Sequence, residues 1–283
     1  MAAALAAVAA LAIALASSQS GASPASDGSA AVGEARQASL TLELPPAVQD
    51  RIQGAQSARG RPIVVIDAGH GGRDPGARSV SGAVSEKELT LALARELRDK
   101  LVERGRVRVA LTRDNDSYLT LEDRAAVARR ADAAMFVSLH MDSAPNPLAR
   151  GASVYSLSDV ASDAEAARFA ALENAGFTTG EGDGSVDSML SGLAMSSQMT
   201  ASAELASRLV KRSAGRFELR PEPHRFAAVH VLRRAGTPAV LFEAGNLSNA
   251  DDELLLVDSK HRSDRVIALA QAIEADVAAR ARR

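Results

Sequence analysis

The feature that most constrains this chain is an uninterrupted run of four β-branched residues, Ile63-Val64-Val65-Ile66, which leads into a glycine-rich loop. A run without polar interruption is typical of a strand buried on both faces, as in the sheet of an α/β fold. The loop glycines permit positive φ angles and close approach of other groups; they are Gly69, Gly71, Gly72 and Gly76. His70 is therefore presented at the end of a strand, where an open α/β sheet carries its chemistry. A tight turn that merely contains a histidine is the alternative for this segment alone.

A second histidine ends another predicted buried strand. The mostly apolar segment 134–140 ends in His140, and Glu86 opens a helix predicted over 86–103. Strand ends of one sheet meet at one edge, so these side chains have a geometric reason to converge with His70. The chain has no cysteine, so any metal site must use His, Asp and Glu. Two imidazoles and one carboxylate, with a free position for water, predict a divalent-metal site of the kind that holds a catalytic zinc.

Glu86 and Arg124 also have ordinary structural explanations. Ser85 and Glu88 form a capping-box pattern at the start of the predicted helix. A carboxylate in a first helical turn is itself favoured by the helix dipole, by about 0.3 to 1 kcal/mol. Arg124 lies in a second helix predicted to begin near Thr120. Such an arginine is more often a packing or salt-bridging residue than a substrate ligand.

Glu243 is the strongest candidate for a general base. It ends the apolar segment 238–243, and a carboxylate at a buried strand end is costly unless it is paired, solvated or needed. A further strand is predicted over 226–232. We interpret the remaining histidines as structural, although His224 has a place from which it could line a cleft; they are His224, His230 in mid-strand and His261 near a helix start.

The rest of the chain completes an alternation of strands and helices. Strands are predicted over 107–111 and 151–155, and a closing helix over 260–279. Residues 158–215 show helical patterns and glycines but no strand pattern. Because this block lies between strand-forming regions, the pattern indicates a helical insertion on the sheet.

The N-terminal part predicts export. Residues 1–16 form an uncharged apolar run that ends in a small-x-small pattern. The run is shorter than the roughly 20 residues of a transmembrane helix, so we interpret it as a signal peptide, which implies a periplasmic or secreted protein. Residues 17–37 have the composition of a linker, and 39–44 alternate as a short strand does. The net charge of −2 offers no basic excess for nucleic-acid binding.

Five motifs follow one another along the chain: 66–72 (IDAGHGG), 86–91 (EKELTL), Thr112-Arg113 with Leu121 and Arg124, 138–140 (SLH), and 241–249 (LFEAGNLSN). Together they resemble the zinc-dependent N-acetylmuramoyl-L-alanine amidases of the periplasmic cell-separation type, amidase type 3. The resemblance covers about 62–283 and implies a single α/β domain, with a mixed, mostly parallel sheet of about six strands flanked by helices. It implies hydrolysis of the amide between N-acetylmuramic acid and L-alanine in peptidoglycan, in cell-wall remodelling and daughter-cell separation.

The same resemblance implies roles for four residues. His70, Glu86 and His140 correspond to the zinc ligands, and Glu243 corresponds to the catalytic glutamate. Zinc would lower the pKa of its bound water toward about 7 and polarise the scissile carbonyl. Glu243 would take the proton of the water and return it to the leaving nitrogen.

The helical block at 158–215 also has a counterpart in this family. In activator-dependent amidases a helix inserted at this place plugs the active site until a partner protein displaces it. Residues 170–175 resemble that region, which makes Glu173 a candidate additional zinc ligand in the resting state only. Glu165 is an equally suitable glutamate in the same block.

Some positions depart from the family pattern. Ala68 stands where the family usually has proline, and Met141 stands where it usually has alanine. Most of the N-terminal wall-targeting domain of the family is absent, so 17–61 is interpreted as a linker with the remnant of that domain. Two other functions stay open: a zinc peptidase of the peptidoglycan stem peptide, and a catalytically silent wall-binding regulatory protein. The silent protein is disfavoured because the four presumed site residues are all present.

Overall fold

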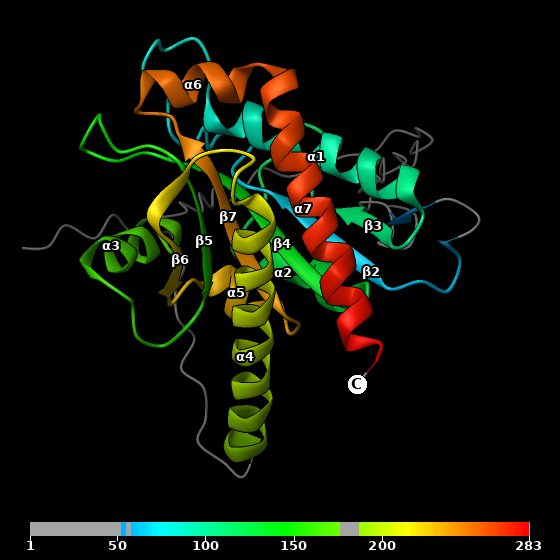
Figure 1. Ribbon diagram of the computed structural model, residues 1–283. Helices are drawn as coiled ribbons and strands as arrows, with labels where there is room; N and C mark the ends of the chain where they lie inside the picture. The colour runs from blue at the N-terminus through cyan, green and yellow to red at the C-terminus, as the bar shows by residue number, and fades with distance from the viewer. Residues whose placement is uncertain (1–51, 55–57, 176–186, 283) are drawn as a thin grey trace, which may run out of the picture. The chain divides into compact units, whose positions relative to one another are not determined.

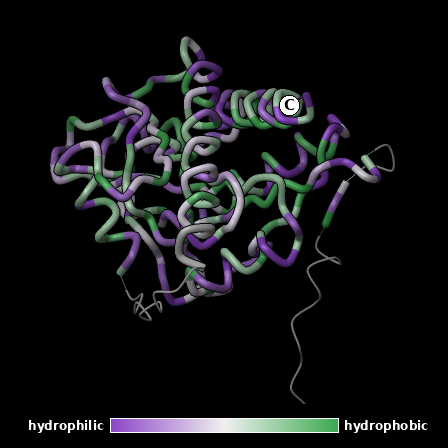
Figure 2. Tube along the Cα trace, turned by 90° about the horizontal axis from the view of Figure 1, so that it is seen from below, coloured by the Kyte–Doolittle hydropathy of each residue, from purple (hydrophilic) through white to green (hydrophobic). Residues whose placement is uncertain are grey.

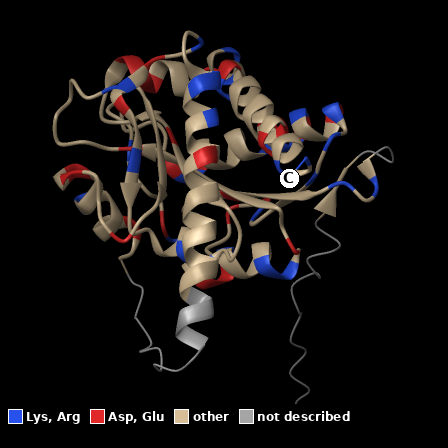
Figure 3. Cartoon of the chain, turned by 60° about the horizontal axis from the view of Figure 1, so that its bottom comes forward, with Lys and Arg blue, Asp and Glu red and all other residues tan. Residues whose placement is uncertain are grey.

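The computed structural model describes residues 52–54, 58–175 and 187–282, and the side chains of these residues except 187–191. The predicted signal peptide, the strand at 39–44 and most of the predicted linker lie outside the described residues. None of the described helices combines the length and the apolar character needed to cross a membrane. Acidic and basic residues are interspersed along the helices (Figure 3).

A seven-stranded mixed sheet forms the centre of the described part of the chain. Its strands are β1 (Ile52–Gln53), β2 (Ile63–Ala68), β3 (Arg108–Leu111), β4 (Met135–Asp142), β5 (Ala152–Leu157), β6 (Leu219–Ala227) and β7 (Ala239–Asn246). Their order across the sheet is β1-β3-β2-β4-β7-β5-β6. Strands β3, β2, β4 and β7 pair in parallel, β1 and β5 pair antiparallel to β3 and β7, and β6 pairs in parallel with β5. The predicted mixed, mostly parallel sheet is confirmed, with the two-residue β1 in addition to the six expected strands.

Helices cover both faces of this sheet. They are α1 (Glu86–Arg104), α2 (Leu121–Arg130), α3 (Ala164–Glu173), α4 (Asp187–Ser213), α5 (His230–Arg234), α6 (Ala250–Val257) and α7 (Ser259–Arg280). One apolar core lies between the sheet and α1, α4 and α7, and a second lies between the sheet and α2, α3 and α5. Figure 1 shows α4 and α7 side by side across the first face. Green and purple segments alternate along α7 in Figure 2, because only one side of this helix faces the core.

Local signals placed the first helix correctly. Helix α1 begins at Glu86, and the Glu88 carboxylate accepts hydrogen bonds from the backbone nitrogen and the hydroxyl of Ser85, at 2.8 and 2.7 Å. Four leucines at four-residue spacing along α1 are buried against the sheet; they are Leu89, Leu93, Leu97 and Leu101. Helix α2 likewise starts after Thr120, whose hydroxyl accepts from the backbone nitrogen of Asp123.

Two strands are longer than predicted. The prediction that His140 and Glu243 end their strands is therefore wrong. Strand β4 continues past His140 to Asp142, and β7 continues past Glu243 to Asn246. The two strands stay paired to their ends, with a register shift between His140 and Asp142. A strand continues past a polar side chain when its backbone groups still form hydrogen bonds with the neighbouring strand.

The strand predicted over 226–232 is also wrong. Strand β6 ends at Ala227, and His230 begins the short helix α5 instead of lying in mid-strand. The Asn174 side chain stabilises the turn between them, because it accepts a hydrogen bond from the His230 backbone nitrogen and donates one to the Ala228 carbonyl. Two prolines concealed the true start of β6, Pro221 and Pro223, which an edge strand tolerates.

The block predicted as a helical insertion, 158–215, is partly built into the core. The second half of α4 contributes three fully buried residues, Leu205, Ala206 and Leu209, to the core that it shares with α7 and β5. Helix α3 packs on the opposite core through Ala166, Phe169 and Ala170. The second half of α4 is thus a structural element of this fold.

A buried ion pair holds the end of β2. Asp67 is 1% exposed and accepts hydrogen bonds from Thr112 Oγ1 (2.7 Å), Ser138 Oγ (2.7 Å) and Arg124 Nη1 (2.8 Å). Arg124 also donates to the carbonyls of Ala68 (2.7 Å) and His70 (2.6 Å). The salt-bridging interpretation of Arg124 is confirmed, and its contacts fix the backbone that presents His70.

Replacing Asp67 (Asp67→Asn) is expected to lower the free energy of unfolding by about 3 kcal/mol, because the buried Arg124 guanidinium loses its counter-charge. Burial raises the pKa of Asp67, but Arg124 and the two hydroxyl donors outweigh burial and hold this pKa below its usual value. A folded-state pKa below the unfolded one contributes stability above about pH 4 that is lost as the pH falls through the folded-state pKa. Urea unfolding should therefore separate wild type and variant more at pH 7 than below pH 4.

The matched control for this change is Asp114→Asn. Asp114 is exposed and pairs with Arg95 (2.7 Å) and Arg98 (2.9 Å). An exposed pair contributes at most about 1 kcal/mol. An equal decrease in the free energy of unfolding of the two variants would contradict the larger stabilisation that we assign to the buried pair.

Candidate functional site

One face of the sheet changes from apolar to polar toward the carboxyl ends of its parallel strands. Alternate side chains of a strand share a face, so the face that packs on α2 and α5 can be followed along each strand. Its first part is apolar, with Val65, Phe136 and Leu241. The following positions on the same strands are polar and buried; they are Asp67, Ser138, His140 and Glu243. Polar groups at this depth require a structural or chemical reason.

The backbone of His70 has a left-handed conformation, and one nitrogen of its ring makes no hydrogen bond in the described residues. Its φ is 58°, and its Nδ1 lies 2.9 Å from Asp74 Oδ2. The carboxylate fixes Nδ1 as the protonated nitrogen, which leaves the lone pair of Nε2 available. This Nε2 is buried, lies 3.0 Å from Glu86 Oε2, and makes no hydrogen bond within the described residues.

The charge around His70 favours a cation. Burial lowers the pKa of the His70 ring, but the carboxylates of Glu86, Glu173 and Asp74 outweigh burial and raise this pKa to about 9. The same field would favour a metal ion at Nε2 in place of the proton.

Glu86 connects the two histidines. It is 4% exposed, and its Oε2 accepts from the Ala77 backbone nitrogen (2.9 Å) while its Oε1 accepts from that of Met141 (3.0 Å). Oε1 also lies 3.0 Å from His140 Nδ1. Burial raises the pKa of Glu86, but its contacts with His140 and His70 outweigh burial and hold this pKa well below the usual range. Glu86 is therefore a fixed anion between two imidazoles.

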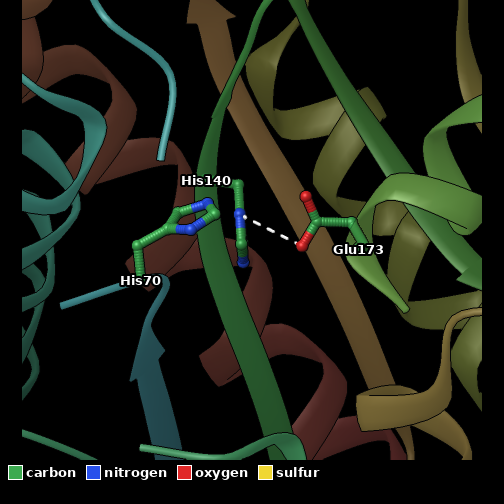
Figure 4. Close-up of side chains that lie close together, drawn as sticks. All are labelled: His70, His140 and Glu173. Carbon is green, nitrogen blue, oxygen red and sulfur yellow. Dashed lines mark ion pairs between the residues drawn. The ribbon is translucent and has the colours of Figure 1, made fainter. Parts of the chain in front are cut away.

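Glu173 reaches the same group from α3. Its Oε2 lies 3.6 Å from His140 Nδ1, and the rings of His140 and His70 stand edge to face with centroids 4.9 Å apart (Figure 4). One ligand atom from each of His70, His140 and Glu173 lies within 4.8 Å of the other two. Glu173 is the last residue of α3, where the helix dipole disfavours a carboxylate, so helix stability does not explain its presence. These three residues could hold a metal ion.

Glycines permit this convergence of donor atoms. A Cβ at Gly69 would lie 2.5 Å from the His140 ring, and a Cβ at Gly76 would lie 2.5 Å from Glu86 Oε2. Gly76 also has a φ of +64°. A side chain at either position would push a donor out of place.

Glu243 is a buried carboxyl group beside His140. It is 1% exposed and is the register partner of His140 across β4 and β7. Its Oε2 and the hydroxyl of its partner on β5, Ser153, are buried without a hydrogen bond in the described part of the chain. Burial, with the negative charges of Asp142, Glu86 and Glu173, raises the pKa of Glu243 well above its usual value. A carboxyl group in this environment exchanges protons closer to neutral pH than an exposed glutamate does.

A cavity of about 450 Å³ opens onto the histidines. Its wall includes His70, His140 and Glu173, the cationic and aromatic side chains of Arg73 and Tyr118, and the apolar Leu172. Glu86 and Glu243 are not among the residues that line it.

The structure separates the remaining candidate residues from this group. Glu165 pairs with Arg220 (2.6 Å) and Arg225 (2.9 Å), so Glu173 is the glutamate of the helical block that approaches His140. His224 Nε2 lies 2.8 Å from Ser156 Oγ on the neighbouring strand, outside the cavity lining. His261 lies beside Asp258 (2.9 Å) at the start of α7.

The sequence analysis missed two residues with roles near the site. Asp74 lies four positions after His70 in the same loop, and this spacing was a signal that could have been used. Arg220 pairs with Asp142 (2.8 Å) and links the end of β4 to α3 through Glu165. No local signal marked Arg220, because the strand that carries it was predicted to begin at 226.

Comparison with known proteins agrees with this fold. Residues 64–275 match the family model described as N-acetylmuramoyl-L-alanine amidase. The N-acetylmuramoyl-L-alanine amidase AmiA of Escherichia coli K12 is 32% identical over 225 residues, which cover 77% of each chain. AmiC of Neisseria meningitidis serogroup B is 34% identical over 223 residues, which cover 76% of this chain and only 52% of that protein.

Solved structures show the same architecture. The catalytic domain of CwlV, an N-acetylmuramoyl-L-alanine amidase from Bacillus (Paenibacillus) polymyxa, superposes with a TM-score of 0.55 at 26% sequence identity, covering 75% of this chain and 96% of that domain. The Ami1 amidase of Mycobacterium smegmatis, at 21% identity, has the same fold with a TM-score of 0.58. The resemblance inferred from five sequence motifs is thus confirmed. The chain belongs to the N-acetylmuramoyl-L-alanine amidase family of enzymes.

Proposed function

We propose that this protein is a zinc-dependent N-acetylmuramoyl-L-alanine amidase that hydrolyses the amide between N-acetylmuramic acid and L-alanine in peptidoglycan. The observation that carries the proposal is the juxtaposition of His70, Glu86 and His140 around a histidine nitrogen that lacks a hydrogen bond. A buried carboxyl group, Glu243, lies on the neighbouring strand. Family membership supports the choice of substrate.

The donor atoms suit zinc. Zinc binds imidazole nitrogen and carboxylate oxygen, commonly with three protein ligands and one open position in catalytic sites. Asp74 orients His70, and two backbone amides orient Glu86, as outer contacts orient the ligands of metal sites. When bound, zinc would polarise the scissile carbonyl and lower the pKa of a coordinated water toward about 7.

Glu243 would carry the proton in this reaction. Its carboxylate would accept a proton from the attacking water and pass it to the nitrogen of the departing L-alanine. Its raised pKa suits both steps, because the group must bind a proton and release it within one turnover.

Glu243→Gln is expected to reduce hydrolysis by about 100- to 10,000-fold, because the amide keeps the size of the side chain but cannot accept the proton. Zinc content should stay that of the wild type, since Glu243 is not a proposed ligand. Mass spectrometry of digested cell-wall sacculi measures intact stem peptides with a free L-alanine amine, and elemental analysis measures zinc. Glu218→Gln, at an exposed pair with Arg150, is the control. Unchanged turnover would refute the role, and cuts within the stem peptide would indicate a peptidase.

Glu86→Gln tests the proposed metal site, and Glu88→Gln, on the same helix turn, is its control. It is expected to lower both bound zinc and hydrolysis, because the carboxylate that joins the two histidines becomes neutral. Glu88→Gln changes only the helix cap and should keep zinc and activity. Elemental analysis of both purified variants is the measurement. A full zinc content in the Glu86 variant, or a different divalent metal in the wild type, would overturn the proposed site.

The structure also supports a self-inhibited resting state, with Glu173 as an additional zinc ligand. Glu173 contacts His140, and Leu172 and Ala175 line the same cavity. Glu243 is buried and does not line the cavity, so a substrate can reach it only after a rearrangement. Displacement of α3 by an activator protein would remove Glu173 and Leu172 together.

Glu173→Ala is expected to raise the basal hydrolysis of the intact protein several-fold, because it releases the contact with His140. Arg168→Ala, an exposed change on α3, is the matched control and should have no effect. These point variants separate inhibition from folding better than deletion of 158–215, because that deletion would remove the core residues of α4. Dye release from labelled sacculi measures the rate. Full activity of the wild type, equal to that of the Glu173 variant, would argue against self-inhibition.

The proposed substrate requires export, because peptidoglycan lies outside the cytoplasmic membrane. We therefore assign 1–16 as a signal peptide, 17–61 as a linker with a remnant of an N-terminal domain, and 62–283 as the catalytic domain, acting in the periplasm or outside the cell. A role in cell division, in daughter-cell separation, is part of this proposal.

A further inference from the structure

We propose that Arg73 and Tyr118 form a subsite for a carboxylate of the stem peptide, so that the enzyme selects substrates by the charge on the peptide side of the scissile amide. This inference rests on the proposed amidase function and adds a specificity determinant to it. Both side chains line the cavity that contains His70 and His140.

Arg73 stands on a hydrogen-bonded turn next to the proposed metal ligands. Gly71 and Asp74 exchange two backbone hydrogen bonds, of 2.9 and 3.2 Å, so that Gly72 and Arg73 form the tip between them. Asp74 in turn contacts the His70 ring. The position of Arg73 is thus coupled to that of His70, three residues earlier.

The opposite loop is locked onto this turn. Asp116 accepts a hydrogen bond from the Gly72 backbone nitrogen at 2.7 Å, and Lys87 donates to both the Gly72 carbonyl (2.9 Å) and Asp116 (2.7 Å). These bonds bring Tyr118 under Arg73, whose guanidinium carbon lies 4.2 Å from the centre of the Tyr118 ring.

This stacking orients the guanidinium and leaves its hydrogen-bonding edge available. A stacked guanidinium contacts the ring through its face, while its N–H donors lie in its own plane. Arg73 forms no ion pair within the described residues, although acidic residues are close in the chain. Asp74 is paired with His70, and Asp116 is paired with Lys87. An exposed, oriented and unpaired guanidinium at a cavity wall suits bidentate binding of a carboxylate.

The chemistry of the substrate indicates which part would bind there. The sugars of peptidoglycan carry hydroxyl and N-acetyl groups, whereas the stem peptide carries carboxylates. An anion-binding group beside the scissile amide therefore recognises the peptide side. The first such group beyond L-alanine is the carboxylate of the second residue, which can be free or amidated.

The test compares two soluble muramoyl-tripeptide glycan fragments that differ only at this second residue, carboxylate in one and carboxamide in the other. The ratio of their kcat/KM values is measured for wild type, Arg73→Gln and Tyr118→Leu, each also in the Glu173→Ala background. Wild type is expected to prefer the carboxylate by about ten-fold, the size of one charge-assisted interaction. Arg73→Gln should abolish this preference and keep turnover of the carboxamide fragment, and Tyr118→Leu should reduce it.

Arg78→Gln is the control, because Arg78 is an exposed arginine of the same loop outside the cavity lining. It should keep the wild-type ratio. The same ratio in wild type and Arg73→Gln would overturn the subsite and leave the amidase function intact. Failure of all forms to hydrolyse either fragment would overturn the amidase function, and the subsite with it.

Discussion

The buried pair of Asp67 and Arg124 is the interaction on which the rest of the site depends. A loop that carries a residue with positive φ has few backbone hydrogen bonds of its own, so its carbonyls need donors from elsewhere. Arginine supplies them: Arg124 donates to the carbonyls of Ala68 and His70, and Arg113 to those of Ala68 and Gly69. The Asp67 carboxylate, on β2, compensates one of these buried charges and ties it to β4 through Ser138 and to the residue after β3 through Thr112. The imidazole of His70 is placed by this scaffold.

Above this scaffold the balance of charge is reversed. Carboxylates from four parts of the chain surround two imidazoles. The pKa values of these carboxylates are shifted in opposite directions. The histidines stabilise Glu86 as an anion and lower its pKa. Glu243 is buried near other negative charges; burial and these charges raise its pKa and favour its protonated form. In the reaction that we propose, this separation gives chemically similar groups different tasks: Glu86 would hold a cation and Glu243 would move a proton.

Local chemistry made some of this structure predictable. The β-branched run of β2 and the capping box of α1 each carry their signal within a few residues, and both elements were predicted correctly. The prediction failed where the outcome depends on distant partners. Strands β4 and β7 extend past His140 and Glu243 because they pair with each other, and β6 starts among prolines because its edge position tolerates them. The approach of Glu173 to His140 depends on how α3 packs, which periodicity alone does not reveal.

The glycines of the loop after β2 have a consequence for how such an enzyme can diversify. Gly69 and Gly76 leave no room for a side chain beside His140 and Glu86, so these positions cannot be used to adjust the chemistry without disturbing it. Arg73 lies between them and faces open space in the cavity. One short loop therefore combines two sterically fixed positions with an open one, and a change of substrate preference at Arg73 would leave the proposed hydrolytic centre untouched.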